Sequence, residues 1–387
     1  VWRGGCGEPP RDILETSMPR PTWAEIDLAA LRRNLHALRR RVGPRVMVMG
    51  VVKADGYGHG AVPVSRTLAD AGIDMLGVAM VEEGAELRAA GVGLPILVMG
   101  LAPEVDLADA LACGLTLTVD GAATARPIER AAAERGAPAA VHLKIDTGMN
   151  RLGVRAEAAA TAAAEVAACP HLRLDGAYTH FACADRADDA VTAAQLAAFA
   201  EALEAVRTSG IEPPLVHAAN SAALLSRPAT HFGMVRSGLA LYGVPPSEAA
   251  RETPLEPVLA LKSRVVATTR VRAGEGVSYG HRWRAERNAL IGVLPVGYAD
   301  GYPRALSNRA RVRAAGRLVP VVGAVCMDLV MVDLTEVPEA APGLEVVLLE
   351  ADNASPLSAA ALAEVAGTIP YEILTGIGRR VPRVYRG

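Results

Sequence analysis

The stretch VMVMGVVKADGYGHG (residues 46–60) joins a continuous apolar run to a lysine and a glycine-rich turn. A short apolar run bounded by a turn is typical of a strand that is buried on both faces of a parallel sheet. Similar runs follow along the chain, and alanine-rich segments with helical periodicity lie between most of them. The eight runs comprise residues 46–52, 75–80, 95–100, 115–119, 140–145, 172–178, 214–219 and 234–242.

Eight strands that alternate with helices predict an α/β fold, a (β/α)8 barrel of the TIM type, over residues 31–248. A doubly wound open sheet has the same alternation, so the strand count leaves both architectures open. The segment PPSEAARETPLEP (245–257) is rich in proline and charge, as linkers are. Strand-like runs without long helices then predict a mostly antiparallel β domain over residues 249–387. We expect the strand-like segment within residues 21–30 to join that domain.

Composition argues against several classes of partner. The 387 residues carry a formal net charge of −2, which favours neither a nucleic-acid partner nor a membrane surface. Five cysteines without paired spacing predict neither a disulfide framework nor a metal site. Residues 1–20 lack the apolar centre of a signal peptide, so we expect a disordered leader, with Met18 a candidate start. No apolar run is long enough to span a bilayer, and these features together predict a cytoplasmic enzyme.

Lysine is rare in this chain. Of the forty basic residues only Lys53, Lys144 and Lys262 are lysines, a bias that a genome rich in G and C explains. Arginine stays protonated at neutral pH, whereas a lysine amine can be tuned to lose its proton and can form a Schiff base. A lysine that persists at the end of a predicted buried strand is therefore a candidate for chemistry, although chance survival of a single lysine is the alternative.

Further polar residues fall at the carboxyl ends of the predicted strands, where the active site of a barrel lies. Each alone could be an ordinary solvated strand end. A lysine that can condense with an aldehyde, together with glycine-containing loops after the last two strands, suggests pyridoxal phosphate as cofactor. The residues are Lys53, Lys144, Asp146, His180, His217, Asn220, Ser221 and Arg236.

The motif VVKADGYGHG (51–60) resembles the cofactor-lysine motif of the alanine racemases. The resemblance extends, in order, over nearly everything after residue 20, and departs from the family mainly at Asp55 and Gly56. A single motif would be weak support, but nine in sequence make accidental agreement implausible. The others are KIDTGMNRLG (144–153), AYTHFACAD (177–185), HAANSAA (217–223), VRSGLALYG (235–243), SYGHRW (278–283), VGYADGYPR (296–304), VCMDL (325–329) and YEILTGIGRRVPRVY (371–385).

The resemblance implies that Lys53 holds pyridoxal 5′-phosphate. It places His180 along the cofactor ring and Arg236 against the pyridine nitrogen. Arginine only donates hydrogen bonds, so that nitrogen would have to accept one and remain unprotonated. The resemblance assigns the cofactor phosphate to Tyr57, Ser221, Gly238, Leu239 and Tyr371.

Racemisation requires a proton to leave one face of Cα and return on the other, so two bases are expected. The resemblance assigns these roles to Lys53 and Tyr279, with Tyr279 coming from the other subunit of a head-to-tail homodimer. It assigns the substrate carboxylate to Arg151 and to Met327, which also comes from the other subunit. It further makes Lys144 a candidate N6-carboxylysine that orients Arg151, and places Tyr298 and Tyr302 at a narrow substrate entrance.

The predicted function is therefore the interconversion of L-alanine and D-alanine, supplying D-alanine for peptidoglycan. A racemase for serine or for many amino acids is one alternative, because pocket width depends on geometry. A pyridoxal-phosphate-dependent decarboxylase of the same architecture is another, although Tyr279, the CMD motif and Arg236 favour a racemase. A non-enzymatic pyridoxal phosphate carrier would give no reason for Tyr279 or Met327.

Overall fold

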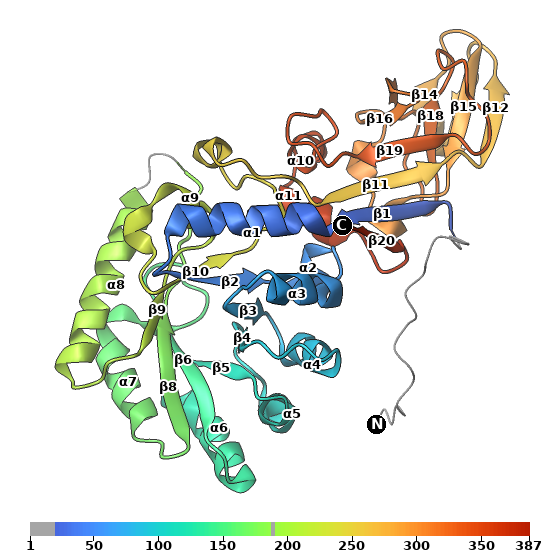
Figure 1. Ribbon diagram of the computed structural model, residues 1–387. Helices are drawn as coiled ribbons and strands as arrows, with labels where there is room; N and C mark the ends of the chain where they lie inside the picture. Colours follow the sequence, from blue (N-terminus) through green and yellow to red (C-terminus); the bar gives the residue numbers. More distant parts are fainter. Residues whose placement is uncertain (1–19, 187–189) are drawn as a thin grey trace.

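The computed structural model describes residues 20–186 and 190–387 (Figure 1). Eight parallel strands form a closed barrel, since β10 pairs with β2 and β5 pairs with β6. The predicted barrel is therefore confirmed and the open doubly wound sheet is excluded. In chain order the strands are β2 (Met47–Val51), β3 (Met75–Val78), β4 (Ile96–Val98), β5 (Thr116–Val119), β6 (Ala139–Asp146), β8 (Leu172–Tyr178), β9 (Leu215–His217) and β10 (Met234–Ser237).

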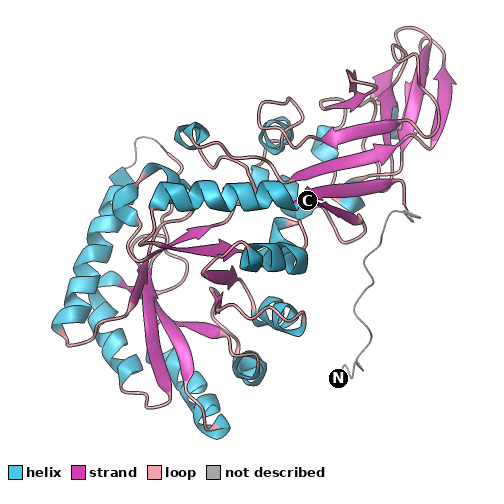
Figure 2. Ribbon diagram, in the orientation of Figure 1, coloured by secondary structure: helices cyan, strands magenta, loops and turns pink. Residues whose placement is uncertain are grey.

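Helices cover the outside of the barrel (Figure 2). The strands are therefore buried on both faces, which explains their continuous apolar runs. Inside the barrel, Met49, Met75, Leu97 and Met234 form a separate buried cluster. The outer helices are α1 (Leu28–Val42), α3 (Ala61–Asp70), α4 (Val81–Ala89), α5 (Leu107–Ala112), α6 (Ala122–Arg135), α7 (Ala159–Ala167), α8 (Ala190–Thr208) and α9 (Ser221–Ser226), and the short β7 (Val154–Arg155) pairs with the end of β6.

The second domain is mostly antiparallel, as predicted. Its larger sheet has the order β17–β16–β19–β11–β1–β20, a three-stranded sheet has the order β12–β15–β18, and β13 pairs with β14. The strands are β1 (Thr22–Asp27), β11 (Leu259–Arg264), β12 (Ala267–Val271), β13 (Gly276–Val277), β14 (Trp283–Arg284), β15 (Ala289–Leu294), β16 (Arg311–Ala314), β17 (Arg317–Pro320), β18 (Val330–Asp333), β19 (Glu345–Leu349) and β20 (Arg383–Arg386), with helices α10 (Ala359–Ala366) and α11 (Pro370–Gly376).

Strand β1 connects the two parts of the molecule. It lies antiparallel to β11 and parallel to β20, then leads directly into α1, which runs along the barrel (Figure 1). The Asp27 side chain caps α1 by accepting a hydrogen bond from the Ala30 N–H. Apart from Arg20, the predicted leader lies outside the described residues. Within the described residues, no helix has the length and apolar character needed to cross a membrane.

Candidate active site

Lys53 directly follows β2 and begins α2 (Lys53–Tyr57), a single turn with an unusual backbone. The four residues after it, Ala54 to Tyr57, have φ values of 52°, 53°, 60° and 54°, so the turn is left-handed. Only Gly56 adopts this conformation without steric cost, and the others cost roughly 1–2 kcal/mol each. Such strain persists only where the surroundings over-determine the conformation.

Several hydrogen bonds hold the left-handed turn. The Asp55 carboxylate accepts a bond of 2.9 Å from the Ala61 N–H. The Nδ1 atom of buried His59 lies 3.1 Å from the Gly56 carbonyl and 2.9 Å from the Tyr57 carbonyl. From the β domain, Arg383 donates two bonds to the Gly58 carbonyl, at 3.1 and 3.0 Å. The turn therefore directs both Lys53 and Tyr57 from one rigid segment.

The Tyr57 hydroxyl reaches the end of β10. A Cβ atom added to Gly238 would lie only 2.4 Å from this hydroxyl, so a glycine is needed for the close approach. The Ser221 hydroxyl accepts bonds from the N–H groups of Gly238 and Ala240, at 2.9 and 3.3 Å. The buried Leu239 N–H between them has no acceptor among the described residues. This group of hydroxyl and N–H donors suits a phosphate.

Aromatic rings close one side of this donor cluster. Tyr57 stacks on buried Tyr242 with ring centroids 4.9 Å apart. Tyr371, from α11 of the β domain, approaches Tyr57 with a centroid distance of 6.0 Å. The sequence-predicted phosphate ligands Tyr57, Ser221, Gly238, Leu239 and Tyr371 thus meet at one place.

Arg236 is buried inside the barrel and contacts imidazoles and carbonyls. Its guanidinium donates to the carbonyls of Thr179 and Ala218, both at 2.8 Å. It also lies 3.0 Å from His217 Nδ1 and 3.1 Å from His180 Nδ1. Because a guanidinium only donates, both of these nitrogens must accept.

This requirement determines which ring nitrogen of His217 carries the proton. With Nδ1 accepting, neutral His217 carries its proton on Nε2, which lies 2.9 Å from His142 Nδ1. A hydrogen-bond chain therefore runs from Arg236 through His217 to His142. Sequence analysis missed His142, although strand alternation places it on the same face of β6 as Lys144 and so inside the barrel.

The interior is electropositive, and this changes how its groups ionise. Burial, then the charges of Arg236 and Arg151, hold the pKa of Lys144 well below its usual value, and Asp146 only partly opposes them. Burial and the Arg236 charge likewise keep the pKa of His180 and of His217 well below the ordinary range. Both histidines are therefore neutral at pH 7. Burial lowers the pKa of Arg236 to about 10, which still leaves it charged.

The loop after β6 brings Arg151 to the barrel mouth. Asp146 orders this loop by accepting bonds of 3.0 Å from the N–H groups of Gly148 and Asn150. The backbone at Gly153 packs onto Lys144, since an added Cβ would lie 3.0 Å from the lysine Cγ. Burial lowers the pKa of Lys53, and the Arg151 charge lowers it further.

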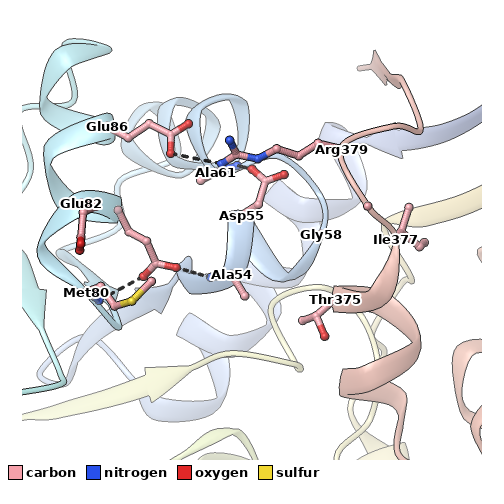
Figure 3. A pocket seen from close by; sticks show the side chains of 12 residues that line it. Ala54, Asp55, Gly58, Ala61, Met80, Glu82, Glu86, Thr375, Ile377 and Arg379 are labelled. Atoms are coloured by element: carbon pink, nitrogen blue, oxygen red, sulfur yellow. Dashed lines mark hydrogen bonds and ion pairs between the residues drawn. The ribbon is translucent and has the colours of Figure 1, made fainter. Parts of the chain in front are cut away.

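A pocket opens beside the left-handed turn, between α4 and the segment that follows α11 (Figure 3). Its walls carry the acidic residues Asp55, Glu82, Glu83 and Glu86, and Arg379 faces them across the opening. Glu83 contacts the turn directly, with its Oε1 2.7 Å from the Ala54 nitrogen. No local sequence signal pointed to this residue.

The remaining predicted site residues lie elsewhere in the single chain. Tyr279 and Met327 project from the β domain with 75% and 54% of their surface exposed, and Tyr298 is also exposed. The strand after Tyr279, β14, lies at the far end of that domain from α2 (Figure 1). Tyr302 is 2% exposed, and its buried hydroxyl finds no partner in the described residues. One copy of the chain therefore does not bring Tyr279 to Lys53.

Both parts of the chain match one family of known proteins. Residues 26–246 match the family model "Alanine racemase, N-terminal domain", and residues 258–385 match "Alanine racemase, C-terminal domain". An alanine racemase of Desulfovibrio desulfuricans is 44% identical over 370 residues, covering 95% of this chain and 99% of that one.

Solved structures agree with these matches. An alanine racemase of Clostridium difficile superposes with a TM-score of 0.92 at 36% identity, covering 96% of this chain and 97% of that one. The alanine racemase of Bacillus anthracis with bound L-Ala-P superposes with a TM-score of 0.90 at 35% identity, covering 96% of both chains. Since both domain models and full-length relatives match, the chain belongs to the alanine racemase family.

Proposed function

We propose that this protein interconverts L-alanine and D-alanine with pyridoxal 5′-phosphate as cofactor. The observation that carries the proposal is one barrel mouth that joins a primary amine, Lys53, to a cluster of phosphate-binding donors. The product D-alanine would supply peptidoglycan.

The chain's own groups fit this cofactor. The Leu239 N–H, which has no acceptor in the described part of the chain, would hold its phosphate together with the hydroxyls of Tyr57, Ser221 and Tyr371 around Gly238. Arg236 would donate to the ring nitrogen, with His180 beside the ring. When bound, the cofactor withdraws electrons from the amino acid and so acidifies its Cα–H bond.

Two groups of the chain would then move the proton. Lys53 serves one face of Cα, and its lowered pKa favours the neutral amine that a base requires. Tyr279 serves the opposite face and comes from a second copy of the chain. The exposure of Tyr279 and Met327 supports this homodimer, because both side chains are free to enter a neighbouring barrel mouth.

The same arrangement would select a small substrate. The Arg151 guanidinium and the Met327 N–H bind the carboxylate. Exposed Tyr298 narrows the entrance, whereas buried Tyr302 acts on it only through packing. A narrow mouth favours a methyl side chain over larger ones.

The deciding experiment follows L-alanine by NMR in heavy water with purified protein and pyridoxal phosphate, alongside a chiral assay. We expect deuterium at Cα and both enantiomers in the product. L-Serine under the same conditions tests a broad-specificity racemase, and loss of CO2 would identify a decarboxylase. Cofactor-loaded protein that neither exchanges nor racemises alanine would refute the proposal.

A second prediction concerns Lys144. Its lowered pKa favours the neutral amine, which can add to CO2 and release a proton to give a carbamate. The negative carbamate would lie where Arg236 and Arg151 concentrate positive charge, and would orient Arg151. We expect a carbamate signal by NMR with 13C-labelled bicarbonate, and its loss in Lys144→Ala. That variant should lose about 10- to 100-fold in kcat/KM, as for one charge-assisted hydrogen bond. A wild-type spectrum identical to that of the variant would contradict the modification.

A further inference from the structure

The left-handed turn after Lys53 has a restraint outside its own segment. Glu83, in the first turn of α4, accepts a bond of 2.7 Å from the Ala54 N–H through Oε1. Through Oε2 it accepts bonds from the N–H groups of Ala79 and Met80, at 2.7 and 3.3 Å. Figure 3 shows the contacts with Ala54 and Met80 as dashed lines.

Part of this arrangement is ordinary helix capping. A glutamate at the third position of a helix commonly folds back to the N–H groups that precede it, as Glu83 does at Ala79 and Met80. The bond to Ala54 is different, because it joins the loop after β3 to the loop after β2. One carboxylate thus bridges two strand ends of the barrel beside Lys53.

The Glu83–Ala54 bond lies at the start of the left-handed turn, next to Lys53. Ala54 is the first left-handed residue and is the neighbour of Lys53, so a bond to its N–H acts where the chain leaves β2. Asp55 and His59 restrain later parts of the same segment. Glu83 restrains its beginning from outside the segment.

The charge of the Glu83 carboxylate also acts on Lys53. The groups that act on Lys53 are Arg151 from the loop after β6 and Glu83 from α4, and Lys53 in turn acts on His180 after β8. Burial and Arg151 lower the pKa of Lys53, whereas the Glu83 carboxylate raises it. Glu83 therefore acts on both the place and the ionisation of the amine.

We propose that Glu83 is a positioning residue for Lys53, whose carboxylate bridge holds the left-handed turn that presents the amine to the barrel mouth. This inference rests on the proposed function in taking Lys53 as the reactive amine.

Glu83→Gln is the sharpest test. Glutamine has the same shape but only one accepting oxygen, so it cannot serve donors on both sides of the bridge. Glu82→Gln is the matched control, since Glu82 lies on the same helix and lines the same pocket. Hydrogen exchange of the cofactor-free full-length chain, followed by peptide mass spectrometry, reports the turn directly.

In Glu83→Gln we expect the peptide over residues 51–60 to exchange at least about tenfold faster. Peptides over β6 should be unchanged, and Glu82→Gln should match the wild type. Trace acetylation, which distinguishes the three lysines by peptide mass, should label Lys53 about threefold more relative to Lys262, because loss of the Glu83 charge lowers the pKa of Lys53 and favours its neutral amine. Faster exchange confined to α4, or spread through the whole barrel, would show a purely structural role and overturn the proposal.

Activity separates this inference from the proposed function. In the holoenzyme, Glu83→Gln should lower kcat about tenfold with little change in KM, because the substrate-binding groups are untouched. Glu82→Gln should keep the wild-type values. If alanine were not the substrate, exchange and labelling would still report the turn. If racemisation held while Glu83→Gln behaved as Glu82→Gln in every assay, this inference alone would fail.

Discussion

Replacement of Lys53 with arginine is expected to lower alanine racemisation by at least about a thousandfold, since general-base catalysis alone contributes about 10²–10⁴-fold. Arginine keeps the positive charge and much of the length of lysine. It offers no primary amine to hold the cofactor and no base near neutral pH. Kinetics in both directions, from L-alanine and from D-alanine, measure the loss.

Lys262→Arg provides the matched control. Lys262 lies in the β domain, where its Nζ pairs with Glu25 at 3.1 Å and Glu345 at 3.6 Å. An arginine can make the same ion pairs, so we expect activity close to that of the wild type. Borohydride reduction and peptide mass spectrometry should locate the cofactor on the peptide that contains Lys53. Full racemisation by Lys53→Arg, or cofactor on another lysine, would disprove the assignment.

Replacement of Tyr279 with phenylalanine should lower racemisation by about 10²–10⁴-fold but preserve part of the exchange chemistry. Lys53 would remain as a base on one face of Cα. The enantiomer that presents its proton to that face should therefore exchange with heavy water without inversion. NMR separates exchange from inversion in one sample. Equal loss of exchange for both enantiomers would contradict an opposite-face role for Tyr279.

Mixed dimers test which copy supplies Tyr279. A heterodimer of Lys53→Arg and Tyr279→Phe chains can be isolated with two affinity tags. If each site combines Lys53 of one chain with Tyr279 of the other, one site carries both substitutions and the other site is intact. Two inactive proteins would then combine to give about half of the wild-type activity. If each chain supplied both groups to its own site, neither site would be intact and no activity would return.

The backbone before Tyr279 supports a defined position for this exposed residue. Ser278 has φ 64° and ψ −174°, a region that is almost exclusive to glycine. The Ser278 hydroxyl donates a bond of 2.8 Å to the Ala324 carbonyl, which holds the chain in this state. A strained and anchored backbone holds this exposed tyrosine in a defined position, as the proposed homodimer requires.

Local pattern was sufficient to predict most of the fold. Continuous Val and Leu runs such as residues 46–52 and 140–145 predicted the barrel strands, because a strand covered on both faces must be apolar throughout. The same reasoning placed Lys53, Lys144 and Arg236 at strand ends. Local pattern could not predict that the barrel closes, because the pairing of β5 with β6 depends on sheet curvature and not on the composition of either strand.

Contacts between distant segments could not be predicted in the same way. The chain His142–His217–Arg236 and the bond from Ala54 to Glu83 join segments that local periodicity does not connect. Tyr298 and Tyr302 lie four positions apart in one motif, yet one is exposed and the other is buried. Their difference comes from the packing of the whole β domain.

The sequence by itself determined the element order and the residue types at the strand ends, because both are encoded in a local pattern of polarity. It also determined the family, because nine motifs occur in order along the chain. Only the tertiary structure decided that the barrel closes, that the turn after Lys53 is left-handed, and that Tyr279 lies away from Lys53 within one chain. Those features arise from contacts between residues far apart in the chain, and their geometry is set when the strands pair and the two domains pack together.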